Sequence, residues 1–178
     1  MNRLILFALC LLTLFFLASC ANGIHSKTGG GSLSASPTQA EISSSEQVVR
    51  VTLSPVTIPQ NGSAEAIVTL SISPGFHVNA NPATFPYLIA TEVKADKIEG
   101  ITVGPPSYPA AEKRKFKFAE QPLAVYQGEV RVRLSLRTEK NAAAGPRSLP
   151  ITVRIQACDE EQCFPPATVK ATIAVDAR

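Results

Sequence analysis

From about residue 46 onward, apolar and polar residues alternate along the chain with a period of two. Successive side chains of a β-strand point to opposite faces of a sheet, so this pattern predicts strands with one buried and one solvent-exposed face. The alternation is clearest in five segments, at residues 49–54, 66–72, 130–137, 151–156 and 169–176.

Turn-forming residues separate these segments. Gly, Pro and Asn are typical of turns, and they occur here at Pro59-Gln60-Asn61-Gly62, Pro74-Gly75, Gly104-Pro105-Pro106 and Gly145-Pro146. The chain has 14 prolines in 178 residues, which disfavours long helices. We therefore expect seven to nine short strands in an all-β, immunoglobulin-like antiparallel β-sandwich, with a closed barrel as the alternative.

The N-terminus has the features of a bacterial export signal at residues 1–19. Arg3 precedes an apolar stretch from Leu4 to Leu17, which is shorter than the about 20 residues that a membrane span needs. The following Leu17-Ala18-Ser19-Cys20 matches the pattern of a lipobox. We expect cleavage before Cys20, lipidation of Cys20 and anchoring of an extracytoplasmic lipoprotein to a membrane. The alternative is an ordinary secretory signal that leaves Cys20 as a free thiol.

Composition divides the rest of the chain into two parts. Residues 20–45 comprise the lipidated cysteine and a segment rich in Gly and Ser, which cannot bury enough apolar surface to fold and predicts a flexible tether. Residues 46–178 would form the single domain. The formal net charge of +3 indicates no particular partner, and no nucleic-acid-binding motif is present.

Two cysteines remain for chemistry, Cys158 and Cys163, because Cys10 leaves with the signal. Cys158 follows one predicted strand and Pro165-Pro166 precede another, so the pair should lie between adjacent strands. The four intervening residues can turn back and bring the two Cα atoms to a disulfide distance of about 4.4–6.8 Å. We expect a redox-active pair.

A purely structural disulfide is the alternative to a redox pair. Closing a loop of about six residues stabilises a fold by only about 2 kcal/mol, against nearly 5 kcal/mol for a 100-residue loop. A stapling bond would therefore be more effective between distant strands. A metal site is disfavoured, because no third or fourth ligand lies nearby and His77 is the only histidine of the predicted domain.

Polar neighbours are the candidates for tuning the pair. Asp159, Glu160 and Glu161 lie between the cysteines, and negative charge there should raise the thiol pKa and slow attack on unselected disulfides. Alternatively, they form a solvated turn and point away. Tyr126 could hydrogen-bond near the pair. For His77 we expect a position at a strand end with a backbone carbonyl as its partner.

The segment 156–166, Gln-Ala-Cys-Asp-Glu-Glu-Gln-Cys-Phe-Pro-Pro, resembles the redox signature of the N-terminal periplasmic domain of the thiol:disulfide interchange protein DsbD. Further segments resemble other parts of that family in the same order, at residues 74–82, 108–109, 115–118 and 123–130. The resemblance extends from about residue 46 to 176.

The resemblance implies an immunoglobulin-like thiol-disulfide oxidoreductase component that needs no cofactor. Cys163 would attack partners and Cys158 would resolve the mixed disulfide. Phe116 or Phe118 would shield the pair from a cap loop, although both could instead be core-facing strand residues. Electrons would come from a membrane carrier of DsbD/CcdA type and pass to periplasmic thioredoxin-like or disulfide-isomerase proteins.

The sequence departs from the family pattern in three respects. Four residues separate the cysteines, where the best-known member has five, and Lys115 and Lys117 flank the aromatic residue where the family cap is acidic. The transmembrane carrier and thioredoxin-like domain of full-length members are missing here, so we expect a separate membrane protein to supply electrons. The competing hypothesis is a non-catalytic envelope-binding or scaffold lipoprotein with a structural disulfide.

Overall fold

In the computed structural model, the described residues are 42–178, and they consist of strands, connecting loops and one short 3₁₀ turn, η1 (Ser45–Gln47). The strands are β1 (Val49–Leu53), β2 (Val56–Ile58), β3 (Ser63–Ile72), β4 (His77–Asn79), β5 (Glu92–Ala95), β6 (Ile101–Val103), β7 (Glu112–Arg114), β8 (Leu123–Tyr126), β9 (Glu129–Thr138), β10 (Gly145–Ile155), β11 (Ala157–Cys158) and β12 (Ala167–Ala177).

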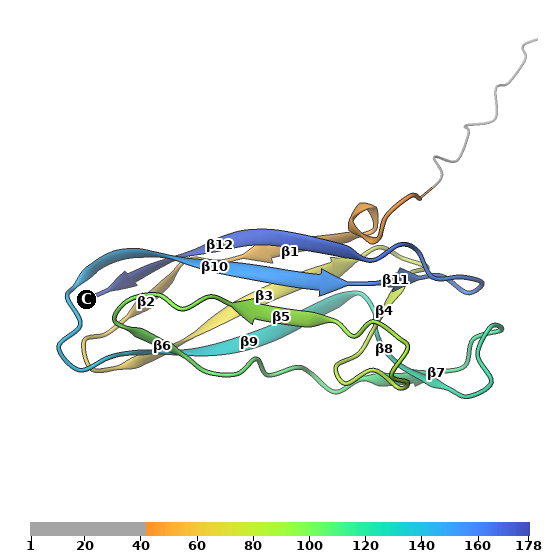
Figure 1. The fold of residues 1–178 in the computed structure, drawn as a ribbon, viewed down its shortest axis with the longest axis horizontal. Coiled ribbons are helices and arrows are strands. Elements are labelled where there is room, and N and C mark those ends of the chain that lie inside the picture. The colour runs from red at the N-terminus through yellow and green to blue at the C-terminus, as the bar shows by residue number, and fades with distance from the viewer. Residues whose placement is uncertain (1–41) are drawn as a thin grey trace, which may run out of the picture. The chain divides into compact units, whose positions relative to one another are not determined.

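These strands form three four-stranded sheets (Figure 1). Sheet A has the order β1-β3-β9-β6, sheet B the order β2-β12-β10-β5, and sheet C the order β11-β4-β8-β7. All pairs are antiparallel except β2 with β12, which is parallel. The predicted all-β, immunoglobulin-like sandwich is confirmed. The expected seven to nine strands were too few, because short strands of two to four residues carry no readable alternation.

The main core lies between sheets A and B, and the alternation of the sequence explains it. In β9, Val130, Val132, Leu134 and Leu136 are at most 3% exposed, while the residues between them face solvent. In β3, the same alternation buries Ala66, Val68, Leu70 and Ile72, and Val68 is the register partner of Val132. Burial of these side chains is the dominant favourable contribution to folding.

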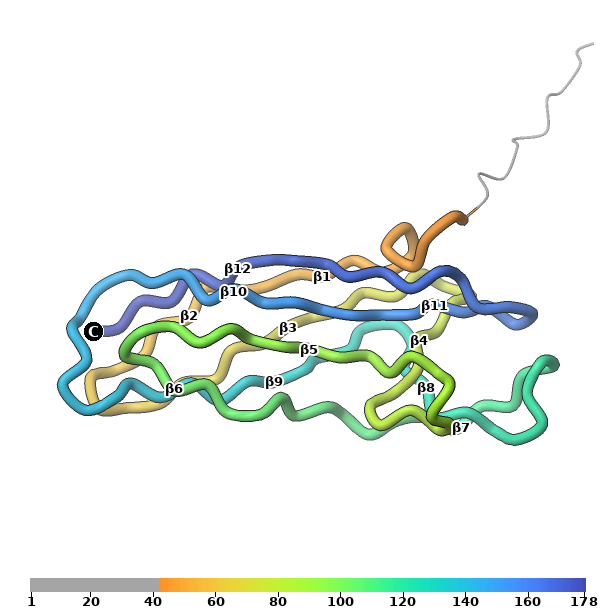
Figure 2. Tube along the Cα trace, viewed as in Figure 1, coloured from red at the N-terminus to blue at the C-terminus, as the bar shows by residue number. Residues whose placement is uncertain are grey.

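Sheet C lies at one end of the sandwich, as the trace in Figure 2 shows for β4, β7, β8 and β11. One face of sheet C belongs to the main core and carries Val78, Tyr126 and Ala157. Because side chains alternate along a strand, the neighbouring residues project from the opposite face. This opposite face, which we call the outer face of sheet C, carries His77, Asn79, Leu123, Val125 and Cys158.

The segment before β1 is packed against the domain. Ser45 is fully buried, its hydroxyl donates to the carbonyl of Pro165 at 2.7 Å, and it accepts from the N–H of Ala157 at 2.8 Å. Ile42 also packs against the core. Hence this segment, which we expected to belong to the tether, contacts the domain through the apolar side chain of Ile42 and through Ser45, whose hydroxyl satisfies backbone groups of Ala157 and Pro165.

The signal peptide, Cys20 and the rest of the expected tether fall within residues 1–41, outside the described residues. Across residues 42–178, the structure contains no helix that is long and apolar enough to cross a membrane.

Candidate functional site

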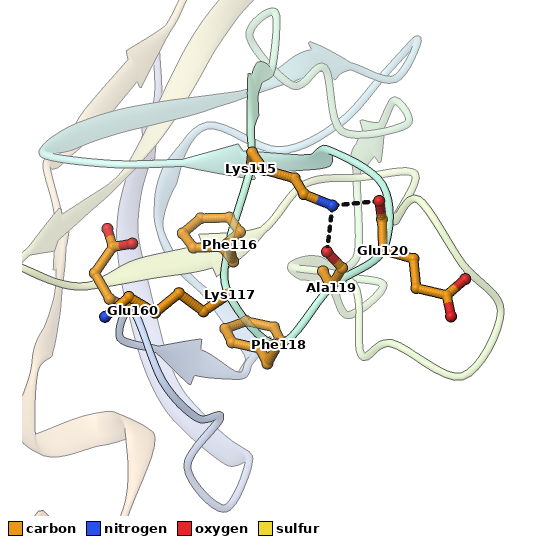
Figure 3. A pocket seen from close by; sticks show the side chains of 7 residues that line it. All are labelled: Lys115, Phe116, Lys117, Phe118, Ala119, Glu120 and Glu160. Carbon is orange, nitrogen blue, oxygen red and sulfur yellow. Dashed lines mark hydrogen bonds between the residues drawn. The ribbon is translucent and has the colours of Figure 1, made fainter.

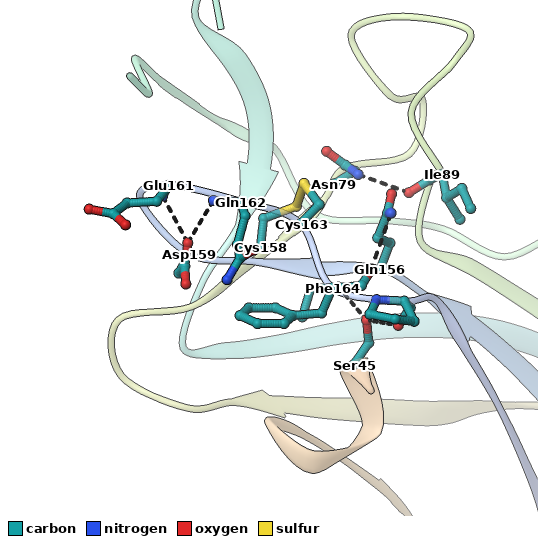
Figure 4. The surroundings of a disulfide bond; sticks show 12 residues. Ser45, Asn79, Ile89, Gln156, Cys158, Asp159, Glu161, Gln162, Cys163 and Phe164 are labelled. Carbon is teal, nitrogen blue, oxygen red and sulfur yellow. Dashed lines mark hydrogen bonds between the residues drawn. A yellow bond between two sulfur atoms is a disulfide. The ribbon is translucent and has the colours of Figure 1, made fainter. Parts of the chain in front are cut away.

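Cys158 and Cys163 form a disulfide with an S–S distance of 2.02 Å (Figure 4). They face each other across a small hairpin that connects β10 to its neighbour β12, which confirms the expected position. The N–H of Asp159 donates to Gln162 at 2.9 Å, and the N–H of Phe164 donates to Ala157 at 2.8 Å. The cysteines are thus a non-hydrogen-bonded antiparallel pair, the kind in which Cα atoms approach most closely.

The two Cα atoms are 3.9 Å apart, which is shorter than the expected range. The sequence indicated a turn, but it did not indicate that the cysteines would sit directly opposite each other in it. The two residues differ in exposure: Cys158 is completely buried, whereas Cys163 is partly exposed. Only Cys163 therefore offers surface to another protein.

The acidic residues of this hairpin, residues 157–164, have partners of their own. Oδ1 of Asp159 accepts from the N–H groups of Glu161 and Gln162, each at 2.8 Å, and so closes the turn. Oε1 of Glu160 lies 3.1 Å from Nη2 of Arg114 on β7. Glu161 is exposed. The geometry matches the solvated turn that the sequence left as an alternative, and an effect on the thiol pKa stays a prediction.

The loop between β7 and β8, residues 115–122, covers the outer face of sheet C, and we call it the cap loop. Phe116 is 1% exposed and clusters with Leu123 and Val125 of that face. Its ring stacks on His77 with centroids 4.0 Å apart. Phe118 also stacks on Phe116, with centroids 5.5 Å apart, and is 41% exposed. Neither aromatic residue lies in a strand, so the alternative that both are core-facing strand residues is wrong.

A pocket of about 550 Å³ separates the cap loop from the cysteine hairpin. Figure 3 shows the rings of Phe116 and Phe118 on one side and Glu160 of the hairpin on the other. The pocket brings together the two segments that the sequence linked to the site.

The basic residues of the cap region hold the loop in place. Nζ of Lys115 donates to the carbonyls of Ala119, at 2.6 Å, and Glu120, which closes the loop internally (Figure 3). The guanidinium of Arg114 lies 5.5 Å from the centroid of the Phe116 ring and also pairs with Glu160. Arg114 therefore ties the cap loop to the cysteine hairpin, a role that the sequence analysis missed.

Two buried polar residues on β4 also belong to the site. His77 and Asn79 are each 1% exposed, and His77 is the register partner of Cys158. Among residues 42–178, Nε2 of His77 and Oδ1 of Asn79 have no hydrogen-bond partner, although Nδ2 of Asn79 donates to the carbonyl of Ile89 at 3.1 Å. His77 begins a strand, as expected, but its Nε2 lacks the expected carbonyl.

The electrostatic environment keeps His77 neutral. Burial, followed by the charge of Arg114, lowers its pKa from 6.5 to about 4, and the carboxylates of Glu160 and Asp159 oppose this shift. Asn79 was missed by sequence reasoning. The run His77-Val78-Asn79 held the signal, since alternation places both polar residues on one face and Val78 on the other.

Tyr126 faces the main core rather than the outer face of sheet C. Its hydroxyl accepts from the N–H of Asn81 at 3.3 Å. The structure thus gives Tyr126 a partner at the Asn81–Pro82 turn and not in the cysteine hairpin. For metal binding, residues 42–178 contain no group of three or more His, Cys, Asp or Glu side chains that could hold an ion.

Sequence comparison agrees with this geometry. The family described as "Thiol:disulfide interchange protein DsbD, N-terminal" matches residues 39–174, which is more than half of the chain. This chain belongs to the DsbD N-terminal domain family. The family takes part in thiol–disulfide exchange, and the match includes both cysteines, β4 and the cap loop. No curated protein matches the chain.

Two solved structures are similar over most of the domain. The DsbD N-terminal domain of Neisseria meningitidis in the reduced form is 19% identical, with a TM-score of 0.46 over 74% of this chain and 88% of that one. The N-terminal periplasmic domain of ScsB from Proteus mirabilis is 16% identical, with a TM-score of 0.43 over 72% of this chain and 45% of that one. The family assignment rests on the sequence match.

Proposed function

We propose that this DsbD N-terminal domain carries electrons by opening and closing the Cys158–Cys163 disulfide. One observation carries the proposal: the cysteines are bonded to each other, with Cys158 buried and Cys163 partly exposed. When only one sulfur of the pair is accessible, that sulfur reacts with a partner first and the buried sulfur reacts second. A bond that served stability alone would need no such difference, and its short loop gives it little stabilising effect.

The difference in exposure supports an order of events. In the dithiol form, the Cys163 thiolate attacks a partner disulfide, forms a mixed disulfide and releases the second partner sulfur as a thiolate. Cys158 then attacks Cys163, the bond to the partner breaks, and its electron pair leaves on the partner sulfur. The partner gains two electrons, this domain loses two, and the intrachain disulfide is restored.

The cap loop would control access to the pair. Phe116 covers the outer face of sheet C, and Phe118 lies outside it with much of its ring exposed. A docking partner would meet Phe118 first and would reach the cysteine hairpin at Glu160, which lines the pocket beside the cap loop. Shielding of this kind limits exchange with small thiols, because thiol–disulfide exchange needs direct access to sulfur.

We place the domain on the extracytoplasmic side of a membrane, anchored through lipidated Cys20. The lipobox and the Gly- and Ser-rich segment after it support this location. A flexible chain of about 25 residues spans roughly 25–30 Å on average, so the domain could reach several partners. It would receive electrons from a membrane carrier of DsbD/CcdA type and reduce thioredoxin-like or disulfide-isomerase proteins.

Trapping the mixed disulfide tests the proposal. In Cys158→Ser the resolving sulfur is absent, so a disulfide-linked complex with a periplasmic thioredoxin-like protein should accumulate. Dithiothreitol should cleave this complex. Cys163→Ser is the matched control and should form no such complex, because the remaining cysteine is buried. If the purified native domain is not reduced by thioredoxin-type reductants under native conditions, the carrier function is wrong and the disulfide is structural.

A further inference from the structure

The outer face of sheet C contains two buried atoms that have no hydrogen-bond partner within the described part of the chain in the disulfide form. These are Nε2 of His77 and Oδ1 of Asn79, two residues apart on β4. Buried polar atoms of folded proteins are almost always paired, and an unpaired one costs free energy. Each exception needs an explanation, and here both occur beside a group that changes its protonation state on reduction.

His77 is the better placed of the two. It is the antiparallel register partner of Cys158, so both side chains project from the same face, where opposite Cβ atoms lie about 4.5–5.5 Å apart. Phe116 stacks on the imidazole at 4.0 Å and covers it from solvent. Cys158 itself is fully buried in the disulfide form, so its sulfur is shielded from water.

We propose that Nε2 of His77 accepts the proton of the Cys158 thiol. In the dithiol form, Nε2 would accept a hydrogen bond from this thiol and so gain the partner that it lacks in the disulfide form. In the resolving step, Nε2 would take the proton as Cys158 attacks the mixed disulfide. This inference rests on the proposed function, because it assigns a role within the same exchange reaction.

The step balances without an added reactant. The proton moves from Cys158 to Nε2, and the resulting thiolate forms the bond to Cys163. The bond between Cys163 and the partner breaks, and its electron pair leaves on the partner sulfur. The imidazolium then returns its proton to this departing thiolate, so His77 is neutral again at the end of the cycle.

The surroundings of His77 suit a proton acceptor that is used only transiently. Its pKa of about 4 in the disulfide form leaves the imidazole neutral and free to accept at pH 5.5 and above. The charged groups that act on it are Arg114 of β7 and, from the cysteine hairpin, Glu160 and Asp159. A new thiolate on Cys158 adds a negative charge beside the ring and favours the imidazolium at that moment.

The reaction of the reduced domain with 5,5′-dithiobis(2-nitrobenzoate) separates the two steps. Attack by Cys163 releases one thionitrobenzoate, and resolution by Cys158 releases the second. The release should be biphasic in the native domain, and the Cys158→Ser variant should show the first phase only. With His77 accepting the proton, the rate of the second phase should change less than threefold between pH 5.5 and 7.5.

His77→Phe keeps a ring that can stack on Phe116 and removes the nitrogen. We expect an unchanged first phase and a second phase at least tenfold slower at pH 6, now rising about tenfold per pH unit because only thiolate formed by hydroxide reacts. His77→Gln retains a hydrogen-bond acceptor that cannot take a proton, and it should show the same steep pH dependence.

Thr138→Val is the control for a substitution at a buried polar residue far from the cysteines. Thr138 pairs with β6, at the end of the sandwich opposite sheet C, so both phases should be unchanged (Figure 1).

The outcomes distinguish a failure of the proposed carrier function from a failure of the proposed role of His77. If the native domain releases no second thionitrobenzoate, the proposed carrier function is wrong. If release is biphasic but the native second phase already rises tenfold per pH unit, the role of His77 is wrong, and this result needs no folded variant. A flat pH profile in His77→Gln or unchanged rates in His77→Phe would also overturn it.

Discussion

The two faces of sheet C differ in kind. One face joins the main core between sheets A and B, where Val78 and Tyr126 pack among aliphatic side chains. The other face carries His77, Asn79 and Cys158 beneath one aromatic ring of the cap loop. The first face has a hydroxyl that accepts a hydrogen bond from a backbone N–H, while the second contains two buried atoms that find no hydrogen-bond partner in residues 42–178.

This difference separates the part of the molecule that stabilises the fold from the part that can change state. A close-packed aliphatic core has one favourable arrangement, and any loss of volume there is felt directly. A small polar cluster under a loop has less packing to lose, and its hydrogen bonding depends on whether two sulfurs carry protons. Substitutions should therefore affect stability from the first face and exchange chemistry from the second.

The largest expected effect is in the main core. Leu134→Ala removes a side chain that is 1% exposed, and we expect the free energy of unfolding to fall by about 2–5 kcal/mol in urea denaturation. Phe118→Ala, at a residue that is 41% exposed, should cost less than about 1 kcal/mol. The folded fraction of Leu134→Ala should keep the native equilibrium constant with glutathione. A tenfold change in this equilibrium constant would show that the two faces are coupled.

The second expected effect is a pH dependence that comes from His77. Its pKa is about 4 when folded and near 6.5 when unfolded, so between these values the unfolded chain binds more protons. The contribution of His77 to the free energy of unfolding is fully present above pH 6.5. As the pH falls toward 4, the free energy of unfolding decreases by about 3 kcal/mol because of this residue.

Urea denaturation of the oxidised domain at pH 7 and pH 4 measures this loss, and the comparison with His77→Phe isolates it from the carboxylates. Asp159 and Glu160 act on His77 from the cysteine hairpin, and Arg114 acts on it from β7. The loss between the two pH values should be smaller by about 3 kcal/mol in His77→Phe. Equal losses in both proteins would mean that the imidazole is not held neutral by burial.

The sandwich was predictable because the alternation of apolar and polar residues can be read within each long strand. Val130, Val132 and Leu134 alternate with arginine and serine, and the structure buries and exposes them in that order. The short strands of sheet C were not predictable in this way. β4 has only three residues, so the alternation of polar His77 and Asn79 with apolar Val78 is too short to predict a strand, and burial of all three residues is not visible in the sequence.

The site was only partly predictable for a related reason. The cysteine pair and Phe116 follow from a motif, but the partners of Arg114 and Lys115 depend on how two loops meet. Arg114 contacts Glu160, 46 residues away, and Lys115 contacts carbonyl groups of its own loop. The sequence shows these residues as one basic run, and only the folded chain separates their roles.

The third expected effect is the contribution of the disulfide to stability. The bond closes a loop of about six residues, so reduction should lower the free energy of unfolding by only about 2 kcal/mol. Urea denaturation of the domain with and without dithiothreitol measures this change, with Cys158→Ser/Cys163→Ser as the permanently open control. A loss above about 4 kcal/mol would show that the bond mainly stabilises the fold and would favour the scaffold hypothesis.

The smallest expected effect on stability comes from the contact between the cap region and the hairpin. Arg114 and Glu160 are 3.1 Å apart, but their side chains are 38% and 53% exposed, and such pairs contribute about 0–1 kcal/mol. Glu160→Gln should therefore leave the free energy of unfolding within about 1 kcal/mol of the native value. Because the pair links the cap loop to the hairpin, alkylation of reduced Cys163 by iodoacetamide should become severalfold faster.

Glu65→Gln serves as the matched control, because it removes a comparable exposed ion pair with Arg133 in sheet A, away from sheet C. It should change neither stability nor alkylation. High salt should raise the alkylation rate of the native domain toward that of Glu160→Gln, since exposed ion pairs are screened. If Glu160→Gln and Glu65→Gln react alike, the cap loop is held by the burial of Phe116 alone, and charge plays no part in the access of partners to Cys163.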